Sequence, residues 1–201
     1  MAAGLLPASL LRRGAGKIPL PAVQGRQQAR PAQPPVPIVR VDKALSMSEV
    51  LRPGNQAPEL ELENQDEQLV SLAGLRGQPV IIYFFPEAFS PGCTTEVCDF
   101  RDNKAALAAA GYVLLGVSAD PPSRLREFRA SNAVNHDLLS DPGGATARRW
   151  GAWGPKTVDG QATTGPVRST FIVDAEGVLK SAQYAVDAKS HVAELRRQVA
   201  V

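Results

Sequence analysis

One stretch of the sequence, residues 79–98, constrains the fold more than any other. It begins with Pro79-Val80-Ile81-Ile82-Tyr83-Phe84-Phe85, a run rich in β-branched and aromatic residues. A strand that is apolar on both faces belongs in the centre of a sheet. A Pro91-Gly92 turn follows, and residues 94–110 then predict a helix that Gly111 ends. A buried strand that runs into a helix in this way indicates an α/β fold.

Both cysteines of the chain, Cys93 and Cys98, lie at the beginning of this predicted helix. In the first turn of a helix, the unpaired backbone N–H groups and the macrodipole favour a thiolate. The thiolate is the nucleophilic form of cysteine, so Cys93 is expected to be reactive; the alternative is an inert buried thiol. Two cysteines without a secretory signal argue for catalytic thiols in a reducing compartment rather than for structural disulfides.

The spacing of the two cysteines makes a second prediction. Five residues of helix place the side chains about 140° apart and the Cα atoms about 8 Å apart. A disulfide needs roughly 4.4–6.8 Å between Cα atoms. Cys93 and Cys98 therefore cannot bond within an intact helix, and a disulfide between them requires the first helical turns to unwind.

Metal and cofactor sites are not expected. A zinc site needs about four ligands. Besides the cysteines the chain offers only His136 and His191, and these are too far apart in sequence to match the short spacing of paired zinc ligands. We interpret these histidines as a loop residue and a helix-surface residue. No glycine-rich phosphate loop occurs, and no run approaches the ~18–20 apolar residues of a membrane span.

The remaining segments predict a mixed sheet with helices on both faces. Their order along the chain is compatible with a single α/β domain. The predicted strands are a short hairpin within residues 57–73, Tyr112–Ser118, Arg168–Val173 and Val178–Tyr184. The predicted helices are Pro122–Ser131, a short one from Ser140-Asp141-Pro142 to Arg149, and Ala188–Val199.

Residues 1–46 differ in composition from the rest of the chain. The first 41 residues contain no Asp or Glu, and seven of the 17 prolines precede Met47. Such a stretch cannot supply a packed core, so we expect a disordered basic extension over 1–46 and one domain over 47–201. The extension is a transit peptide, a functional arm, or the product of a start codon assigned too early. We favour the last, because Met47-Ser48-Glu49 opens directly onto the domain.

The basic balance of the chain comes from this extension. Residues 47–201 carry 15 Lys and Arg against 19 Asp and Glu, whereas the whole chain has a net charge of +2. The charge therefore does not indicate nucleic-acid binding.

The cysteine segment resembles that of a known family. The string Pro-x-x-x-Ser-x-x-Cys, followed by Thr-x-x-x-Cys-Asp-Phe-Arg-Asp, is similar to peroxiredoxins of the Q type, the bacterioferritin comigratory proteins. Arg168-Ser-Thr-Phe-Ile-Val-Asp174 and Trp150-Gly-Ala-Trp-Gly154 extend the resemblance, which covers residues 48–201. It implies a thioredoxin-like fold. The family usually has Thr where this chain has Ser90, but the hydroxyl is retained.

The resemblance also implies roles for five residues. Cys93 corresponds to the peroxidatic cysteine, Cys98 to the resolving cysteine, and Arg168 to the group that stabilises thiolate and peroxide. Pro86 is expected to end the strand, and the resemblance implies that it also shields the thiolate; the two roles are compatible. Ser90 hydrogen-bonds the peroxide, or only its own turn. For Arg168 the alternative is a surface charge at a strand edge.

Two neighbours of the cysteines have less specific interpretations. Glu96 lies three residues after Cys93, on the same helix face, and we predict that it orients Arg168 rather than being a solvated surface residue. Arg101 is interpreted as one partner of a structural ion pair.

These observations predict a thiol peroxidase that reduces hydrogen peroxide or organic hydroperoxides through a sulfenic acid and an intramolecular disulfide. The resemblance implies thioredoxin as the reductant, without metal, haem or flavin. We expect a cytoplasmic monomer, or an organelle protein if residues 1–46 are a transit peptide. The alternatives are a thiol-disulfide oxidoreductase, whose usual signature is Cys-x-x-Cys, and a peroxide-sensing redox relay.

Overall fold

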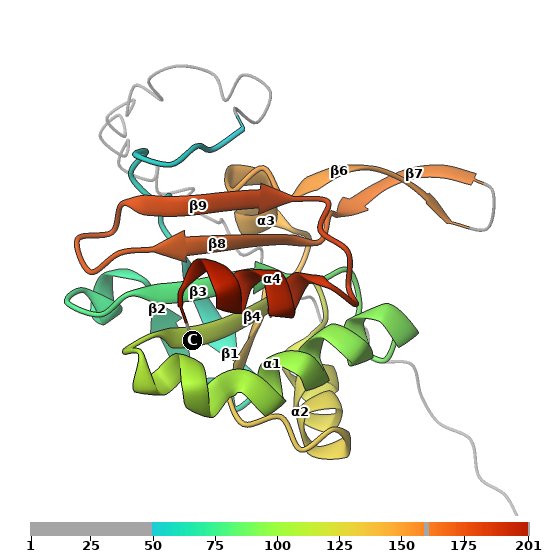
Figure 1. Cartoon of the computed structure of the whole chain (residues 1–201). Helices are drawn as coiled ribbons and strands as arrows, with labels where there is room; N and C mark the ends of the chain where they lie inside the picture. Colours follow the sequence, from blue (N-terminus) through green and yellow to red (C-terminus); the bar gives the residue numbers. More distant parts are fainter. Residues whose placement is uncertain (1–49, 159–160, 201) are drawn as a thin grey trace, which may run out of the picture. The chain divides into compact units, whose positions relative to one another are not determined.

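The computed structural model describes residues 50–158 and 161–200, and the predicted extension over residues 1–46 lies outside this part of the chain. Its centre is a seven-stranded sheet in the order β2-β1-β5-β4-β3-β8-β9 (Figure 1). The strands are β1 (Glu61–Asn64), β2 (Leu69–Ser71), β3 (Val80–Phe84), β4 (Val113–Ser118), β5 (Asp137–Ser140), β8 (Ser169–Val173) and β9 (Leu179–Tyr184).

Strand β3 is the buried central strand that the sequence predicts. Each of its five residues is buried, and it pairs in parallel with β4 and antiparallel with β8. Strand β5 continues the sheet in parallel beside β4, whereas β1, β2 and β9 are antiparallel to their neighbours. The sheet is therefore mixed, as expected.

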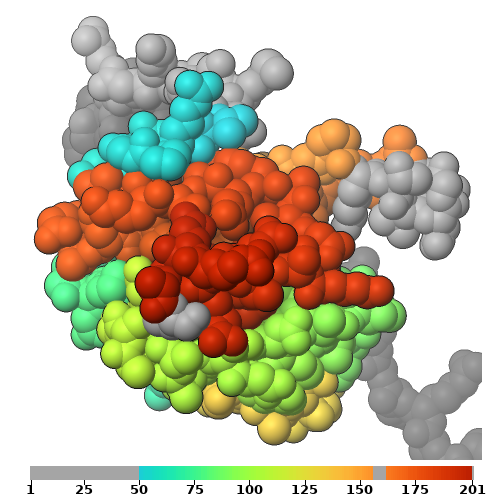
Figure 2. Space-filling view, in the orientation of Figure 1, coloured from blue at the N-terminus to red at the C-terminus, as the bar shows by residue number. Residues whose placement is uncertain are grey.

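Helices cover both faces of this sheet. They are α1 (Pro91–Ala109), α2 (Pro122–Ser131), α3 (Ala145–Arg149) and α4 (His191–Gln198), with a 3₁₀ turn η1 at Ala73–Leu75. Side chains alternate along β3, so Ile81 and Tyr83 join a core with α1, α2 and α4. Ile82 and Phe84 join a second core on the opposite face with α3. In the space-filling view α4 lies against the sheet beside α1 (Figure 2).

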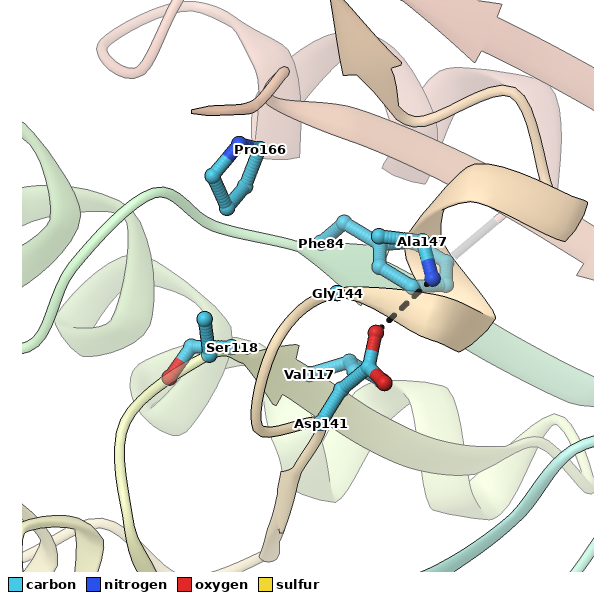
Figure 3. A pocket seen from close by; sticks show the side chains of 8 residues that line it. Phe84, Val117, Ser118, Asp141, Gly144, Ala147 and Pro166 are labelled. Atoms are coloured by element: carbon cyan, nitrogen blue, oxygen red, sulfur yellow. Dashed lines mark hydrogen bonds between the residues drawn. The ribbon is translucent and has the colours of Figure 1, made fainter. Parts of the chain in front are cut away.

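The start of α3 differs from the prediction. The helix begins at Ala145, but Asp141 still caps it, because its two carboxylate oxygens accept hydrogen bonds from the backbone N–H groups of Thr146 and Ala147 at 3.0 and 2.8 Å. Figure 3 shows the hydrogen bond to Ala147. Gly144 has φ +72°, and a Cβ there would overlap the ring of Trp153. The chain must therefore turn through glycine before α3.

Three strands of the structure, β5, β6 and β7, were not predicted from the sequence. Strand β5 has four residues, too few for a clear period. Strands β6 (Trp153–Val158) and β7 (Gln161–Pro166) form a separate antiparallel hairpin, drawn in orange in Figure 1. Their sequences mix Gly, Pro, Lys and Thr without alternation, so no strand pattern was visible.

His136 lies in the loop before β5, as predicted, but the prediction that His191 lies on a helix surface was wrong, and both histidines are buried. His136 and His191 are 5% and 2% exposed. The Tyr83 hydroxyl lies 2.7 Å from His136 Nε2, and the Thr170 hydroxyl 2.7 Å from His191 Nε2. Burial lowers the pKa of His136 to about 3 and that of His191 to about 4, so both are neutral. Among the described residues, no helix is long and apolar enough to cross a membrane.

Candidate active site

Cys93 lies in the first turn of α1, as predicted. Strand β3 ends at Phe84, the loop runs to Ser90, and Ser90 is the N-cap with extended backbone, followed by proline at the first helical position. The Cys93 side chain is fully buried against the core beneath α1. The positive end of the helix dipole is therefore close to its sulfur.

Arg168 reaches Cys93 from the neighbouring strand. It directly precedes β8, and β8 pairs with β3 so that Ser169 lies opposite Phe84. This register brings Arg168 to the edge of the sheet where the loop before Cys93 begins. Its Nη2 donates a hydrogen bond to Cys93 Sγ at 3.2 Å. A guanidinium in this position stabilises a thiolate.

Glu96 forms the other contact of this guanidinium. Arg168 Nη1 donates a hydrogen bond to Glu96 Oε2, while Glu96 Oε1 has no partner among the described residues. The Glu96 side chain is fully buried rather than solvated. Burial raises its pKa from 4.5 to about 7, although Arg168 acts in the opposite direction. The carboxyl therefore titrates near neutral pH, in contact with the arginine that faces Cys93.

Pro86 and Ser90 lie in the loop between β3 and α1, and both are half-buried. The Ser90 hydroxyl donates to the carbonyl of Glu87 at 3.1 Å, within its own turn. The structure thus brings Cys93, Glu96 and Arg168 into direct contact, whereas the hydrogen bond of Ser90 lies in the loop.

Cys98 is half-buried and lies on the same unbroken helix as Cys93, and both cysteines are free thiols. Arg101 forms the ion pair expected from the sequence, with Nε 2.8 Å from Asp102 Oδ1. It also contacts sulfur, because its Nη1 lies 3.5 Å from Cys98 Sγ.

Sequence reasoning missed a pair of residues that holds the loop before Cys93. Asp120, just after β4, accepts a hydrogen bond from the backbone N–H of Ala88 at 2.8 Å. Arg124 pairs with Asp120 at 3.0 Å and donates to the Ala88 carbonyl and the Glu87 carboxylate, both at 3.2 Å. The position of Asp120 at the carboxyl end of a parallel strand was the only available signal.

The same loop contains a residue with unusual backbone geometry. Phe89 has φ +69°, and its side chain is 44% exposed. Its ring packs edge-on against Phe128 at 5.0 Å, and the Arg124 guanidinium lies 5.7 Å from the ring centroid. Positive φ is unfavourable for a bulky residue, so the contacts of Asp120, Arg124 and Phe128 must hold the loop in this conformation.

Comparison with known proteins now identifies the family. A sequence model of the AhpC/TSA family matches residues 53–182, more than half of the chain. The chain belongs to the AhpC/TSA family.

Individual relatives in the AhpC/TSA family place the chain more closely. It is 38% identical to peroxiredoxin Bcp of Escherichia coli over 130 residues, which cover 65% of this chain and 83% of the relative. It is 37% identical to peroxiredoxin Bcp of Bacillus subtilis over 141 residues, which cover 70% of this chain and 90% of the relative.

Solved structures agree with these relatives. The bacterioferritin comigratory protein of Xanthomonas campestris, studied for its alkyl peroxide reduction activity, matches with a TM-score of 0.66 at 29% identity, covering 70% of this chain and 90% of that one. Peroxidoxin BcpB of Mycobacterium tuberculosis matches with a TM-score of 0.66 at 26% identity, covering 75% and 97%. The predicted thioredoxin-like fold and membership of the peroxiredoxin Q group are confirmed, and the protein is a thiol peroxidase.

Proposed function

We propose that the peroxidase reaction proceeds through Cys93 as the peroxidatic and Cys98 as the resolving cysteine. The observation that carries this proposal is the hydrogen bond of 3.2 Å from Arg168 Nη2 to Cys93 Sγ at the start of α1. The Cys93 thiolate attacks one peroxide oxygen and the O–O bond breaks. The departing oxygen takes up a proton and leaves as water or an alcohol, and Cys93 becomes a sulfenic acid.

Arg168 and Glu96 act together in this first step. The guanidinium holds the thiolate and the peroxide oxygens, and the Glu96 carboxylate fixes the orientation of the guanidinium. Because the proton of the Ser90 hydroxyl is donated to Glu87, its oxygen is free to accept the peroxide O–H. Pro86 shields the thiolate from water.

Cys98 completes the cycle. Its thiolate attacks the Cys93 sulfur, an S–S bond forms and the sulfenic oxygen leaves as water. An external dithiol then supplies two electrons, and we propose thioredoxin as this partner. The half-buried position of Cys98 on an unbroken helix supports a cycle in which α1 opens before the disulfide forms. We further propose that the enzyme acts as a monomer in the reducing environment of the cytoplasm.

Two single variants test these roles. Hydrogen peroxide and a bulky organic hydroperoxide are supplied with thioredoxin, thioredoxin reductase and NADPH, and NADPH oxidation is followed. Cys93→Ser is expected to be inactive. Cys98→Ser is expected to consume about one equivalent of peroxide and then to stall with thioredoxin, because the sulfenic acid on Cys93 has no second thiol in the chain with which to form a disulfide. Full activity of Cys93→Ser, or sustained turnover by Cys98→Ser, would show that the roles are assigned wrongly.

A further inference from the structure

Cys98 lies in a polar cluster that the description of the peroxide site does not use. Arg101 Nη1 is 3.5 Å from its sulfur, and Asn132 Oδ1, at the end of α2, is 3.9 Å from it. Arg101 Nη1 also donates to the backbone carbonyl of Asn132 at 2.7 Å, and Arg101 Nε pairs with Asp102. The guanidinium is therefore held next to the sulfur by partners on α1 and at the end of α2.

The two neighbours of Cys98 Sγ favour opposite protonation states. Asn132 Nδ2 donates to the carbonyl of Phe128 at 2.9 Å, which orients the amide so that its oxygen faces Cys98. An amide oxygen only accepts hydrogen bonds, so it stabilises the neutral thiol. A guanidinium only donates, and its positive charge stabilises the thiolate.

Ionisable groups on the elements packed around Cys98 leave Arg101 as the cation in contact with it. Tyr83 of β3 is neutral, because burial raises its pKa well above the ordinary value. His136, which forms a hydrogen bond with Tyr83, is also neutral at physiological pH. Arg129 of α2 pairs with Asp66 at 3.2 Å.

On α1 itself, two carboxylates, Asp99 and Asp102, follow Cys98 in the sequence. Asp102 is engaged by Arg101, whereas Asp99, next to Cys98 in sequence, has the opposite charge to Arg101 and opposes a thiolate. Asp99 and the Asn132 Oδ1 atom both disfavour a negative charge on the Cys98 sulfur, and the Arg101 guanidinium is the group that favours it.

We propose that Arg101 is a catalytic residue of the second half-reaction, in which its guanidinium stabilises the Cys98 thiolate that attacks oxidised Cys93. This inference rests on the proposed intramolecular disulfide. In the step, the Cys98 sulfur forms the S–S bond with its electron pair, the S–O bond of the sulfenic acid breaks, and the departing hydroxide takes up a proton to become water. The oxidising equivalents come from the peroxide already reduced by Cys93.

The contact with Arg101 is suited to a step in which α1 opens. Arg101 is only three residues from Cys98 along the chain, so once its guanidinium releases the Asn132 carbonyl it can follow the sulfur when the first turns of the helix unwind. Asn132 is 34 residues away in sequence, and the contact with it breaks. Opening therefore removes the group that stabilises the thiol and keeps the group that stabilises the thiolate.

The rate of disulfide formation measures this role directly. Reduced protein is mixed with one equivalent of hydrogen peroxide and quenched with an alkylating reagent, and the disulfide is counted by mass spectrometry between pH 5.5 and 9. In Arg101→Gln, disulfide formation at pH 7 is expected to slow by about tenfold and to recover at high pH, where the thiolate forms without help. Arg101→Lys keeps the charge and is expected to retain most of the rate at pH 7.

A second variant covers the possibility that Arg101→Gln folds poorly. Asn132→Asp places a carboxylate beside both Cys98 and the Arg101 guanidinium, where it competes with the thiolate for that guanidinium, so it is expected to slow disulfide formation and to move its pH profile upward. Arg126→Gln, which removes an exposed arginine of α2 that pairs with Glu67, is the matched control and should behave as wild type.

The outcomes distinguish a failure of this inference from a failure of the proposed disulfide on which it rests. If the wild-type protein forms no disulfide between Cys93 and Cys98, the proposed resolving step itself is wrong. If it forms one, and Arg101→Gln or Asn132→Asp forms it at the wild-type rate at pH 7, the role of Arg101 is refuted. A loss that is equal at every pH also refutes it, because a merely structural contact would produce that pattern.

Discussion

Arg168 contacts both the Cys93 sulfur and the Glu96 carboxylate. We predict that Arg168→Gln lowers the second-order rate constant for hydrogen peroxide by about 10²-fold, the usual effect of removing one charge-stabilising donor. Arg168→Lys keeps the charge but cannot contact both partners with a planar fork, so it should be intermediate. Stopped-flow fluorescence at pH 7 measures the rate constants, and equal rates for the Lys and Gln variants would argue against the two-partner geometry.

The protonation of Glu96 makes the unfolding free energy of the protein depend on pH. The pKa of Glu96 in the folded protein, about 7, is higher than the ordinary value of 4.5, so the folded state binds this proton more tightly than the unfolded state. The resulting stabilisation is complete below about pH 4.5 and is lost as the pH rises through about 7. We predict that Glu96→Gln removes a pH-dependent loss of up to about 3 kcal/mol in unfolding free energy between pH 5 and pH 8.

Urea denaturation at both pH values tests this linkage. The comparison is between wild type, Glu96→Gln, and Glu127→Gln as a control on an exposed position of α2. The same pH slope in wild type and Glu96→Gln would show that the buried carboxyl does not titrate in this range.

At the scale of elements, the proposed disulfide requires α1 to adopt two conformations. Cys93 and Cys98 lie on one continuous helix, and five residues of helix separate their Cα atoms by about 8 Å, beyond the reach of a disulfide. We predict that oxidation removes the amide hydrogen-exchange protection of the first turns of α1, and far-UV circular dichroism should show a matching loss of helix. Equal protection of residues 93–104 in the reduced and oxidised protein would contradict the unwinding step.

We predict that the loop before α1 controls how readily this opening occurs. Arg124 and Asp120 hold the backbone of Ala88, next to Phe89 with its positive φ. We predict that Arg124→Gln favours the open form, which slows the first reaction with peroxide and speeds disulfide formation. At high peroxide the variant should therefore accumulate less Cys93 sulfinic acid than wild type.

Mass spectrometry of peroxide-treated protein measures that sulfinic acid, with Arg126→Gln of the same helix as the matched control. More sulfinic acid in Arg124→Gln than in wild type would show that this clamp does not hold α1 closed. Arg101→Gln should have the opposite effect, because it slows resolution without loosening the loop.

At the scale of the whole molecule, the elements with strong local patterns were predictable. The all-apolar run of β3 and the proline and glycine boundaries of α1 and α2 gave their positions within a few residues. Strand β5 and the hairpin β6–β7 could not be predicted, because four residues or a mixed polar sequence carry no clear period. The burial of the histidines could not be predicted for a different reason: that of His136 depends on the hydroxyl of Tyr83, a partner 53 residues away.

The same distinction applies to the site. The position of Cys93 at a helix start follows from its neighbours in sequence, and the family motif indicated Arg168. The contacts of Asp120 with the loop and of Asn132 with Cys98 join segments more than 30 residues apart, and no local pattern marks them. These contacts become visible only when the register of the sheet brings β4 and α2 beside α1.

The packing between sheet and helix gives the last prediction. Gly116 of β4 lies opposite Tyr83, and a Cβ there would be 2.6 Å from the tyrosine ring and 2.8 Å from Leu138. Tyr83 in turn stacks on Phe100 of α1, with ring centroids 4.2 Å apart. We predict that Gly116→Ala forces this stack apart and lowers the unfolding free energy by about 1–3 kcal/mol.

Thermal and urea unfolding of the reduced protein measure this loss. Gly111→Ala is the matched control: φ is +88° at Gly111 and no atom lies within 4 Å of the added Cβ, so its effect is limited to backbone strain of about 1 kcal/mol. Because Phe100 belongs to α1, Gly116→Ala should also reduce hydrogen-exchange protection around Phe100, whereas Gly111→Ala should not. Unchanged stability and protection in Gly116→Ala would mean that Tyr83 can move aside without disturbing α1.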